Sequence, residues 1–198
     1  MTESTVVGLI LAAGQGSRFG GVKVLAPFAG RPLLQLVLDA AAAAGIDQRV
    51  VVLGHAADDV ERAISWQGER RVRNPTPEAG LSSSLKVGMA TIEAEFPAAQ
   101  AILVLLADQP TVSPDVIRAL IRASGEAARP IVIPRYQGDG SLNPVVIGRS
   151  AWWLIEATEG DRGLGPILAG RPDLVVEVPV RGSNPDVDTP ADLAILAG

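Results

Sequence analysis

An apolar run that ends in a glycine-rich, basic loop is the feature that most constrains how this chain can fold. The run extends from Val6 to Leu11 without a charged residue, which is typical of a strand buried in a parallel sheet. The loop that follows, residues 12–23, contains four glycines together with Arg18 and Lys23. Glycines let backbone N–H groups approach an anion, and the two side chains supply positive charge. The pattern therefore predicts a polyphosphate-binding loop.

Two common phosphate loops do not fit this sequence. The dinucleotide fingerprint G-x-G-x-x-G fails because Phe19 stands where the third glycine belongs, after Gly14 and Gly16. The P-loop fails because Val22 stands where its lysine belongs, directly after Gly21. An ordinary strand-to-helix turn is the remaining alternative, and the two basic side chains favour phosphate binding over it.

The composition narrows the class of protein. With 198 residues, 47% hydrophobic and 20% charged, the chain can form one globular α/β domain with a sizeable core. It has no cysteine, which excludes disulfides, zinc–thiolate sites, iron–sulfur clusters and thiol catalysis. The net charge of −5, without a dense cluster of Lys and Arg, argues against a nucleic-acid partner.

The chain is expected to be cytoplasmic, with no membrane partner. Its opening residues Met1–Thr5 are acidic and lack the apolar core of a signal peptide. Its apolar runs all fall short of the roughly 20 residues that a membrane-spanning helix needs.

Strand-like and helix-like segments alternate along the chain. Apolar, β-branched runs predict strands at Val6–Leu11, Arg49–Leu53, Ala101–Leu106, Pro130–Ile133 and Leu174–Val178. Helical patterns cover Pro32–Ala44, Ala57–Ser65 and Ser82–Glu95, and two further helices follow the N-cap residues Ser113 and Thr189. This alternation predicts a mostly parallel sheet in a three-layer α/β/α arrangement.

The chain is expected to form a single domain with two functional halves. The loop Arg135–Leu142 separates a nucleotide-binding half, about residues 1–135, from an acceptor-binding half, about residues 136–198.

Carboxylates follow the predicted strands where a ligand is expected. In open α/β sheets ligands bind beyond the carboxyl ends of the strands, and Asp108 directly follows the strand Ala101–Leu106 and Ala107. A second acidic pair, Asp186 and Asp188, precedes the last predicted helix. Two carboxylates beside a triphosphate suffice for Mg²⁺, which takes its other ligands from phosphate and water. Thr189 is the better N-cap for the last predicted helix, so Asp188 is favoured over Asp186 as the second metal ligand. The alternative for Asp108 is a structural role in a turn or as a helix N-cap.

Three motifs, taken together, resemble one enzyme family. They are the loop L-A-A-G-x-G-x-R-x-G-x-x-K, the strand end Asp108-Gln109-Pro110 and the segment D-x-D-T-P-x-D-L that begins at Asp186. In this order they resemble the molybdenum-cofactor nucleotidyltransferases (MobA-like and MocA-like NTP transferases), most closely the cytidylyltransferase branch. The resemblance extends from Val6 to Leu196. It implies a Rossmann-like α/β nucleotidyltransferase fold, dependence on Mg²⁺, and transfer of CMP from CTP to molybdopterin with release of pyrophosphate.

The resemblance also implies roles for individual residues. The residues expected to bind the nucleotide are Leu11, Ala12, Ala13, Gly14, Gly16, Ser17, Arg18, Lys23, Gly80, Ser82, Ser83 and Asp108. Lys23, at the α-phosphate, and Arg18, at the leaving phosphates, are the expected catalytic residues, while Asp108 and Asp188 would hold Mg²⁺. Ala13 stands where the guanylyl branch has glycine, which favours CTP. For the serines, a helix N-cap is the alternative role.

The acceptor half follows the family less closely. The residues expected to bind the acceptor are Gln109, Asn143, Asp161 and Arg162. Asn143 stands where the cytidylyl branch has histidine, and Gly165 stands where it has arginine, a place that Arg162 could fill. A sugar phosphate or polyol phosphate therefore remains an alternative acceptor.

The expected chemistry is an in-line attack of a substrate phosphate on the α-phosphorus of CTP. That phosphate is already anionic at neutral pH, since its second pKa is about 6, so no strong general base is needed. His55 is accordingly interpreted as structural or peripheral. A non-catalytic carrier of a nucleotide-bearing cofactor is the second alternative. A molybdoenzyme or its chaperone is a possible partner, with Trp152 and Trp153 as candidate contacts; burial of at least one of them is the simpler interpretation.

Overall fold

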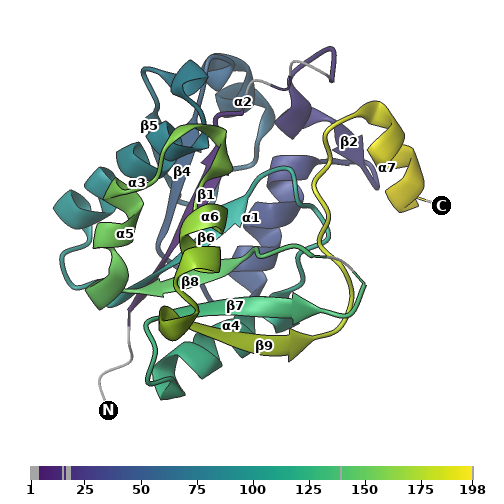
Figure 1. Ribbon diagram of the computed structural model, residues 1–198. Coiled ribbons are helices and arrows are strands. Elements are labelled where there is room, and N and C mark those ends of the chain that lie inside the picture. Colours follow the sequence, from purple (N-terminus) through teal and green to yellow (C-terminus); the bar gives the residue numbers. More distant parts are fainter. Residues whose placement is uncertain (1–4, 15, 17–18, 139, 198) are drawn as a thin grey trace.

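A twisted sheet of seven strands forms the centre of the described part of the chain, which in this computed structural model comprises residues 5–14, 16, 19–138 and 140–197 (Figure 1). The strand order is β5-β4-β1-β6-β8-β7-β9. The strands are β1 (Val6–Ala12), β4 (Arg49–Leu53), β5 (Arg70–Arg73), β6 (Ala101–Leu106), β7 (Ile131–Tyr136), β8 (Val145–Gly148) and β9 (Val175–Val180). A separate hairpin consists of β2 (Pro27–Phe28) and β3 (Arg31–Pro32).

The pairing of the strands confirms the mostly parallel sheet. Strand β1 pairs in parallel with β4 and β6, β4 pairs in parallel with β5, and β7 pairs in parallel with β9. Strand β8 runs antiparallel to its two neighbours, β6 and β7. Each of the five strands expected from the sequence is present, whereas the four-residue β8 is too short to stand out by its apolar pattern. The Rossmann-like α/β class is thus confirmed.

Helices cover both faces of the sheet. They are α1 (Leu33–Ala43), α2 (Ala57–Ala63), α3 (Leu81–Glu95), α4 (Pro114–Glu126), α5 (Trp153–Glu156), α6 (Gly165–Gly170) and α7 (Pro190–Ala197). Single 3₁₀ turns occur at η1 (Lys23–Leu25), η2 (Pro77–Ala79), η3 (Arg149–Ala151), η4 (Gly160–Arg162) and η5 (Pro172–Leu174). Ser113 caps α4 as expected, because its hydroxyl accepts a hydrogen bond from the N–H of Val116 at 3.2 Å.

The alternation of side chains along the strands produces a core on each face. In β1, Leu9 and Leu11 pack with α3, α5 and α6, whereas Ile10 and Ala12 pack with α1, α2 and α4. Successive side chains of a strand point to opposite faces, so a continuous apolar strand fills both layers. This explains why the opening run carries no polar residue.

The segment before α7 is held against the hairpin of β2 and β3. Val187 is fully buried in a small cluster with Ala26 and Leu33, on which α7 also packs. Thr189 and Asp192 cap α7 reciprocally: Thr189 Oγ1 accepts from the N–H of Asp192, and Asp192 Oδ2 accepts from the N–H of Thr189. Val187 is buried in this cluster, and Asp186 and Asp188 stand on either side of it in the sequence.

Among the helices of the described residues, none has the length and apolar character required to cross a lipid bilayer.

Candidate active site

A cavity of about 500 Å³ lies at the carboxyl ends of β1 and β6. It is lined by Leu11, Ala13, Gly14, Gly16, Lys23, Val24, Pro77, Glu78, Gly80, Leu81, Ser84, Leu106, Asp108, Asp161, Asp186 and Asp188. These residues come from the end of β1 and the glycine-rich loop, from η2 and the start of α3, from the end of β6, from η4, and from the segment before α7. The cavity is therefore where ligands bind in open α/β sheets.

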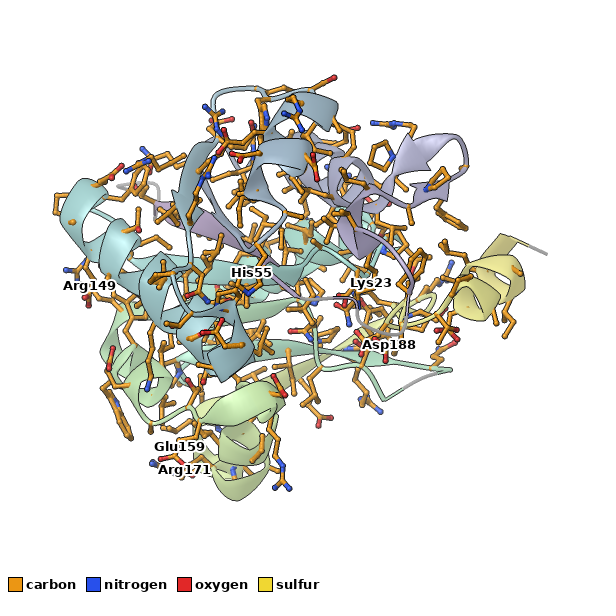
Figure 2. The ribbon with its side chains drawn as sticks, turned by 90° about the horizontal axis from the view of Figure 1, so that it is seen from above. Lys23, His55, Arg149, Glu159, Arg171 and Asp188 are labelled. Atoms are coloured by element: carbon orange, nitrogen blue, oxygen red, sulfur yellow. The ribbon has the colours of Figure 1, made fainter. Side chains whose placement is uncertain are left out.

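Lys23 lies between two carboxylates of this cavity, and Figure 2 shows it beside one of them, Asp188. Its ammonium Nζ is 2.6 Å from Asp108 Oδ2 and 3.2 Å from Asp188 Oδ1, while its side chain is 9% exposed. Burial by itself would lower the pKa of Lys23, but the two carboxylates outweigh it and the pKa lies above its usual value. Lys23 is therefore positively charged throughout the neutral range.

The loop backbone closes tightly around the stem of Lys23. Gly16 has a φ of +56°, and a Cβ atom placed there would lie 2.8 Å from the Cβ of Lys23. Only glycine fits such a conformation together with such a contact. The position of Lys23 thus depends on a glycine seven residues away that the sequence pattern singles out.

The two carboxylates that contact Lys23 fit a hard divalent cation. One oxygen of each carboxylate lies within hydrogen-bonding distance of the same ammonium group. The two carboxylates are therefore close enough for one ion to bridge them. Carboxylate oxygens are the ligands that Mg²⁺ and Mn²⁺ prefer. Among the described residues no group of three or more His, Cys, Asp and Glu side chains forms a complete metal site, so such an ion would need phosphate oxygens or water as further ligands.

Most of the predicted nucleotide-binding residues meet in this cavity. Leu11, Ala13, Gly14, Gly16, Lys23, Gly80 and Asp108 line it, as does the predicted metal ligand Asp188. Ser17 and Arg18 lie outside the described residues. The side chain of Ala12 instead packs on the opposite face of the sheet with α1, because it alternates with its neighbours in β1.

The serines at the start of α3 are placed differently from the prediction. Ser82 and Ser83 do not line the cavity; Ser82 is buried, and Ser83 Oγ donates to Gly80 O at 2.8 Å. Ser84, which the sequence analysis did not select, lines the cavity instead. The N-cap alternative is also wrong, since α3 begins at Leu81 and Gly80 is its N-cap. Each step along an α-helix turns the side chain by about 100°, so the three serines point in different directions. Of the three, Ser84 is the one that lines the cavity.

Gly80 brings the acceptor half of the chain against the start of α3. A Cβ atom at Gly80 would lie 2.6 Å from Asp161 Oδ1 and 2.6 Å from the carbonyl carbon of Gly160. Its φ of +93° is also favourable only for glycine. This close approach places Asp161 in the wall of the cavity.

A second cavity of about 460 Å³ adjoins the first. All four residues predicted to bind the acceptor line it: Gln109, Asn143, Asp161 and Arg162. Gly165 lines it too, so Arg162 faces the same space that the expected arginine would have occupied. Leucine and valine side chains from β1, β6, β8, α3 and α6 form most of the remaining wall. Asp161 and Asp186 belong to both cavities and mark the junction between them.

Asp186 differs from Asp188 in its surroundings. Its Oδ1 accepts a hydrogen bond from Gln109 Nε2 at 2.8 Å, whereas Asp188 contacts Lys23. Burial and the nearby Asp108 carboxylate raise the pKa of Asp186, although the hydrogen bond from Gln109 opposes this. Asp188 is thus the one of the pair that lies against the ammonium, and its selection as a metal ligand stays a prediction.

His55 and the two tryptophans lie away from Lys23. His55 lies on the rim, where its Nε2 is 3.4 Å from Glu78 Oε2, and its side chain is exposed, as a peripheral role requires (Figure 2). Trp152 is buried and donates from Nε1 to Ile147 O at 3.1 Å, whereas Trp153 is exposed. The expected burial of at least one tryptophan is confirmed.

Comparison with known proteins places these features in a family. Residues 8–175 match the family described as MobA-like NTP transferase domain. The "Nicotine blue oxidoreductase" of Paenarthrobacter nicotinovorans is 31% identical over 194 residues, which is 93% of this chain and 92% of that protein. The "Bifunctional protein GlmU" of Sorangium cellulosum is 37% identical over 119 residues, or 57% of this chain and 24% of that protein. The chain therefore spans only about a quarter of the length of that relative.

Solved structures agree over the whole chain. Rv0371c from Mycobacterium tuberculosis H37Rv has a TM-score of 0.89 and 34% identity, with coverage of 100% of this chain and 99% of that chain. A structure of Rv0371c in complex with manganese has a TM-score of 0.83 and 32% identity, with coverage of 98% of both chains.

Proposed function

Because this chain belongs to the MobA-like NTP transferase domain family, and is thus a nucleotidyltransferase, we propose that it transfers CMP from CTP to molybdopterin, using Mg²⁺ and releasing pyrophosphate. One observation carries the proposal: a buried ammonium, Lys23, lies between two carboxylates beside a glycine loop at the carboxyl edge of the sheet. A triphosphate needs this combination of fixed positive charge, open backbone and oxygen ligands for a metal ion.

The nucleotide would bind in the first cavity. The backbone of Gly14 and Gly16 supports the departing phosphates, together with Ser17 and Arg18, which follow in the sequence. Lys23 stabilises the charge that develops at the α-phosphate, because its ammonium is fixed and largely shielded from water. The base would lie against Leu11 and Ala13, where the methyl group of Ala13 narrows the space and favours a pyrimidine.

The carboxylates Asp108 and Asp188 would hold the metal ion. When bound, the ion supplies positive charge that offsets the charge of the phosphates and orients them for in-line displacement. Support comes from the geometry of the two carboxylates and from the manganese complex of the similar Rv0371c.

The acceptor would bind in the second cavity, which the C-terminal half of the chain largely supplies. Its apolar wall suits a ring system, and Arg162 provides a positive charge for a phosphate. An acceptor phosphate at the junction near Asp161 and Asp186 would meet the α-phosphate from the side of the second cavity. It is already an anion at neutral pH, so it needs no general base, and the guanidinium of Arg162 would supply the positive charge that orients it. A molybdoenzyme or its chaperone would then receive the product.

The direct test is an assay of pyrophosphate release by the whole chain. CTP, GTP and ATP are each combined with molybdopterin, a sugar 1-phosphate or a polyol phosphate, with and without Mg²⁺. The proposal expects release only with Mg²⁺, fastest with CTP and molybdopterin. If pyrophosphate is released with CTP and a sugar or polyol phosphate but not with molybdopterin, the reaction stands and the acceptor is different. If the chain binds the nucleotide product tightly but releases no pyrophosphate under any condition, it is a carrier.

One relative makes a further control necessary. The relative from Paenarthrobacter nicotinovorans bears the name of an oxidoreductase. The chain is therefore also mixed with a reduced nicotinamide nucleotide and an oxidised dye as electron acceptor, and oxidation of the nucleotide is monitored. Oxidation without pyrophosphate release would contradict the proposal; the sequence argues against it, since Phe19 replaces the third glycine of the dinucleotide fingerprint.

A further inference from the structure

A buried amide pair, Gln109 and Asn184, links three loops around the junction of the two cavities. Asn184 is 1% exposed and Gln109 is 3% exposed, although the two are far apart in the sequence. Asn184 Nδ2 donates to Gln109 Oε1 at 3.1 Å and to the carbonyl oxygen of Asn143 at 3.2 Å. Asn184 Oδ1 accepts from Thr111 Oγ1 at 3.3 Å. The amide of Asn184 thus contacts the loop after β6 and the loop before β8.

The contact with Asn184 fixes which way the amide of Gln109 points. Because Gln109 Oε1 accepts from Asn184, its Nε2 group is directed to the other side, where it donates to Asp186 Oδ1 at 2.8 Å and to Ser141 Oγ at 3.2 Å. The reverse orientation would set an amide oxygen against the carboxylate of Asp186 and an amide NH₂ against that of Asn184. One donor group on Asn184 therefore decides the contact that Gln109 makes with both Asp186 and Ser141.

The residues tied together in this way surround the acceptor cavity. Gln109, Ser141, Asn143 and Asp186 line it, whereas Asn184 lies behind them and lines neither cavity. Figure 1 shows the segment that contains Asn184 running from the end of β9 to α7. In the described part of the chain no buried side-chain nitrogen or oxygen lacks a hydrogen-bond partner. Removing the donor of Asn184 would take the hydrogen bond from Gln109 Oε1 directly behind this wall and, among the described residues, would leave Asn143 O with only the hydrogen bond from the Tyr136 hydroxyl at 3.3 Å.

We propose that Asn184 is a positioning residue for the acceptor: its side-chain NH₂ holds Asn143 directly, and holds Ser141 and Asp186 by orienting Gln109. This inference rests on the proposed function for the existence of an acceptor. The nucleotide side is held independently of Asn184, because Lys23 is fixed by Asp108 and Asp188, and Val187 N donates to Asp108 O at 2.9 Å. A change at Asn184 should therefore separate acceptor binding from nucleotide binding.

The test uses Asn184→Asp, which keeps the shape of the side chain and removes its NH₂ donors. Its matched control is Gln35→Glu, the same amide-to-acid change at another buried amide, which contacts Asp39 and Ser65 on the α1 side of the sheet. Both variants change the net charge by one unit. Asn184→Ala, which leaves room for a water molecule, is measured in parallel and provides the result if the aspartate variant does not fold.

The first measurement is amide hydrogen exchange of the ligand-free chain, followed by mass spectrometry. For Asn184→Asp we expect faster exchange in peptides covering residues 140–145 and 109–112, and unchanged exchange in residues 80–88. For Gln35→Glu we expect no change in any of these segments. Unchanged exchange at 140–145 in both Asn184 variants would overturn the inference. This readout does not depend on which reaction the chain catalyses.

The second measurement is steady-state pyrophosphate release with CTP and molybdopterin. We expect the KM for molybdopterin to rise about tenfold or more, as for a misplaced reacting group, with the KM for CTP within about twofold of the wild type. Equal changes in the two KM values would overturn the inference and show a general structural effect. If the wild type releases no pyrophosphate, the proposed function fails, and the exchange result alone decides whether Asn184 positions this wall.

Discussion

At the scale of single residues, Lys23 is the group on which the chemistry depends. In the ligand-free chain its ammonium neutralises Asp108 and Asp188, the two carboxylates that are proposed to bind a metal ion. A bound metal ion and Lys23 would therefore compete for the same oxygens, until the phosphates of a nucleotide offer the ammonium another partner. Lys23 would then have two successive roles, first with the carboxylates and afterwards with the α-phosphate.

This competition gives a prediction with opposite signs in two assays. Lys23→Met should lower pyrophosphate release by about a hundredfold or more, the usual effect of losing one donor to a developing charge. The same variant should bind Mn²⁺ more tightly than the wild type without nucleotide, measured by electron paramagnetic resonance of free Mn²⁺. Mn²⁺ binding weaker than that of the wild type would contradict the competition, and wild-type turnover would remove Lys23 from the mechanism.

Two glycines of the same loop provide a matched pair of variants. A Cβ atom at Gly16 would meet the stem of Lys23, whereas a Cβ atom at Gly21 would meet nothing within 4 Å. Gly16→Ala should raise the KM for the nucleotide at least about tenfold through displacement of Lys23. Gly21→Ala should leave it within about twofold. Similar KM values for the two variants, from initial rates, would show that the loop does not depend on the close contact at Gly16.

At the scale of elements, a buried ion pair fixes the edge of the sheet. Arg49 begins β4 and Glu69 directly precedes β5; their side chains are 5% and 1% exposed and meet at 2.8 Å. Burial by itself would raise the pKa of Glu69, but hydrogen bonds from the N–H groups of Gln67 and Glu69, and from Arg49, lower it below its usual value. The pair is thus a structural feature, distant from the cavity, that holds β5 against β4.

Removing one partner of this pair should be costly. Glu69→Leu leaves Arg49 buried without its counter-ion, and the expected loss is about 3–5 kcal/mol in the free energy of unfolding, measured by urea denaturation. The control is Glu95→Gln, which breaks the exposed pair with Arg70 and should change stability little. Equal effects from the two variants would show that the burial of the Arg49–Glu69 pair does not matter.

The same carboxylate predicts the direction of a pH effect. Because the pKa of Glu69 is lower in the folded chain than in the unfolded chain, its ionised form stabilises the fold. That contribution is fully present above the unfolded value of about 4.5 and is lost as the pH falls through the lower, folded pKa. Between pH 5 and pH 2, the stability of the wild type should therefore fall more steeply than that of Glu69→Gln. Parallel curves would contradict this.

The elements also show what local sequence can predict. Strand β1 and the glycine loop could be predicted because buried β-branched residues and glycines act locally. The N-cap of α4 was predictable for the same reason, since Ser113 needs only the N–H three residues later. The start of α3 was not, because Gly80 is held as its N-cap by contact with Gly160 and Asp161, which are distant in sequence.

At the scale of the whole molecule, the site is where three distant parts of the chain meet. The glycine loop, the end of β6 and the segment before α7 converge because parallel strands place their carboxyl ends on one edge. This rule made the meeting of Lys23, Asp108 and Asp188 predictable from the sequence. The supporting contact of Asn184 with Gln109 was not predictable, because nothing local indicates which buried amides will pair.

The two adjoining cavities provide room for a nucleotide and an acceptor. Most residues matched to the nucleotide line one cavity and those matched to the acceptor line the next, so two substrates would lie side by side; a carrier would bind their joined product across both cavities, and pyrophosphate release is what separates the two functions. Asp161 and Asp186 at the junction mark where the two substrates would meet. The division of the chain into a nucleotide half and an acceptor half is proposed on this basis.

The measurement that tests the account most directly is a crystal structure of the chain with CTP and Mn²⁺, using the anomalous signal of manganese. We expect the triphosphate on the backbone of Gly14 and Gly16, the ion bound by Asp108 and Asp188, and Lys23 moved onto the α-phosphate. A manganese peak remote from Asp108 and Asp188, or a triphosphate bound outside the cavity that they line, would contradict the account.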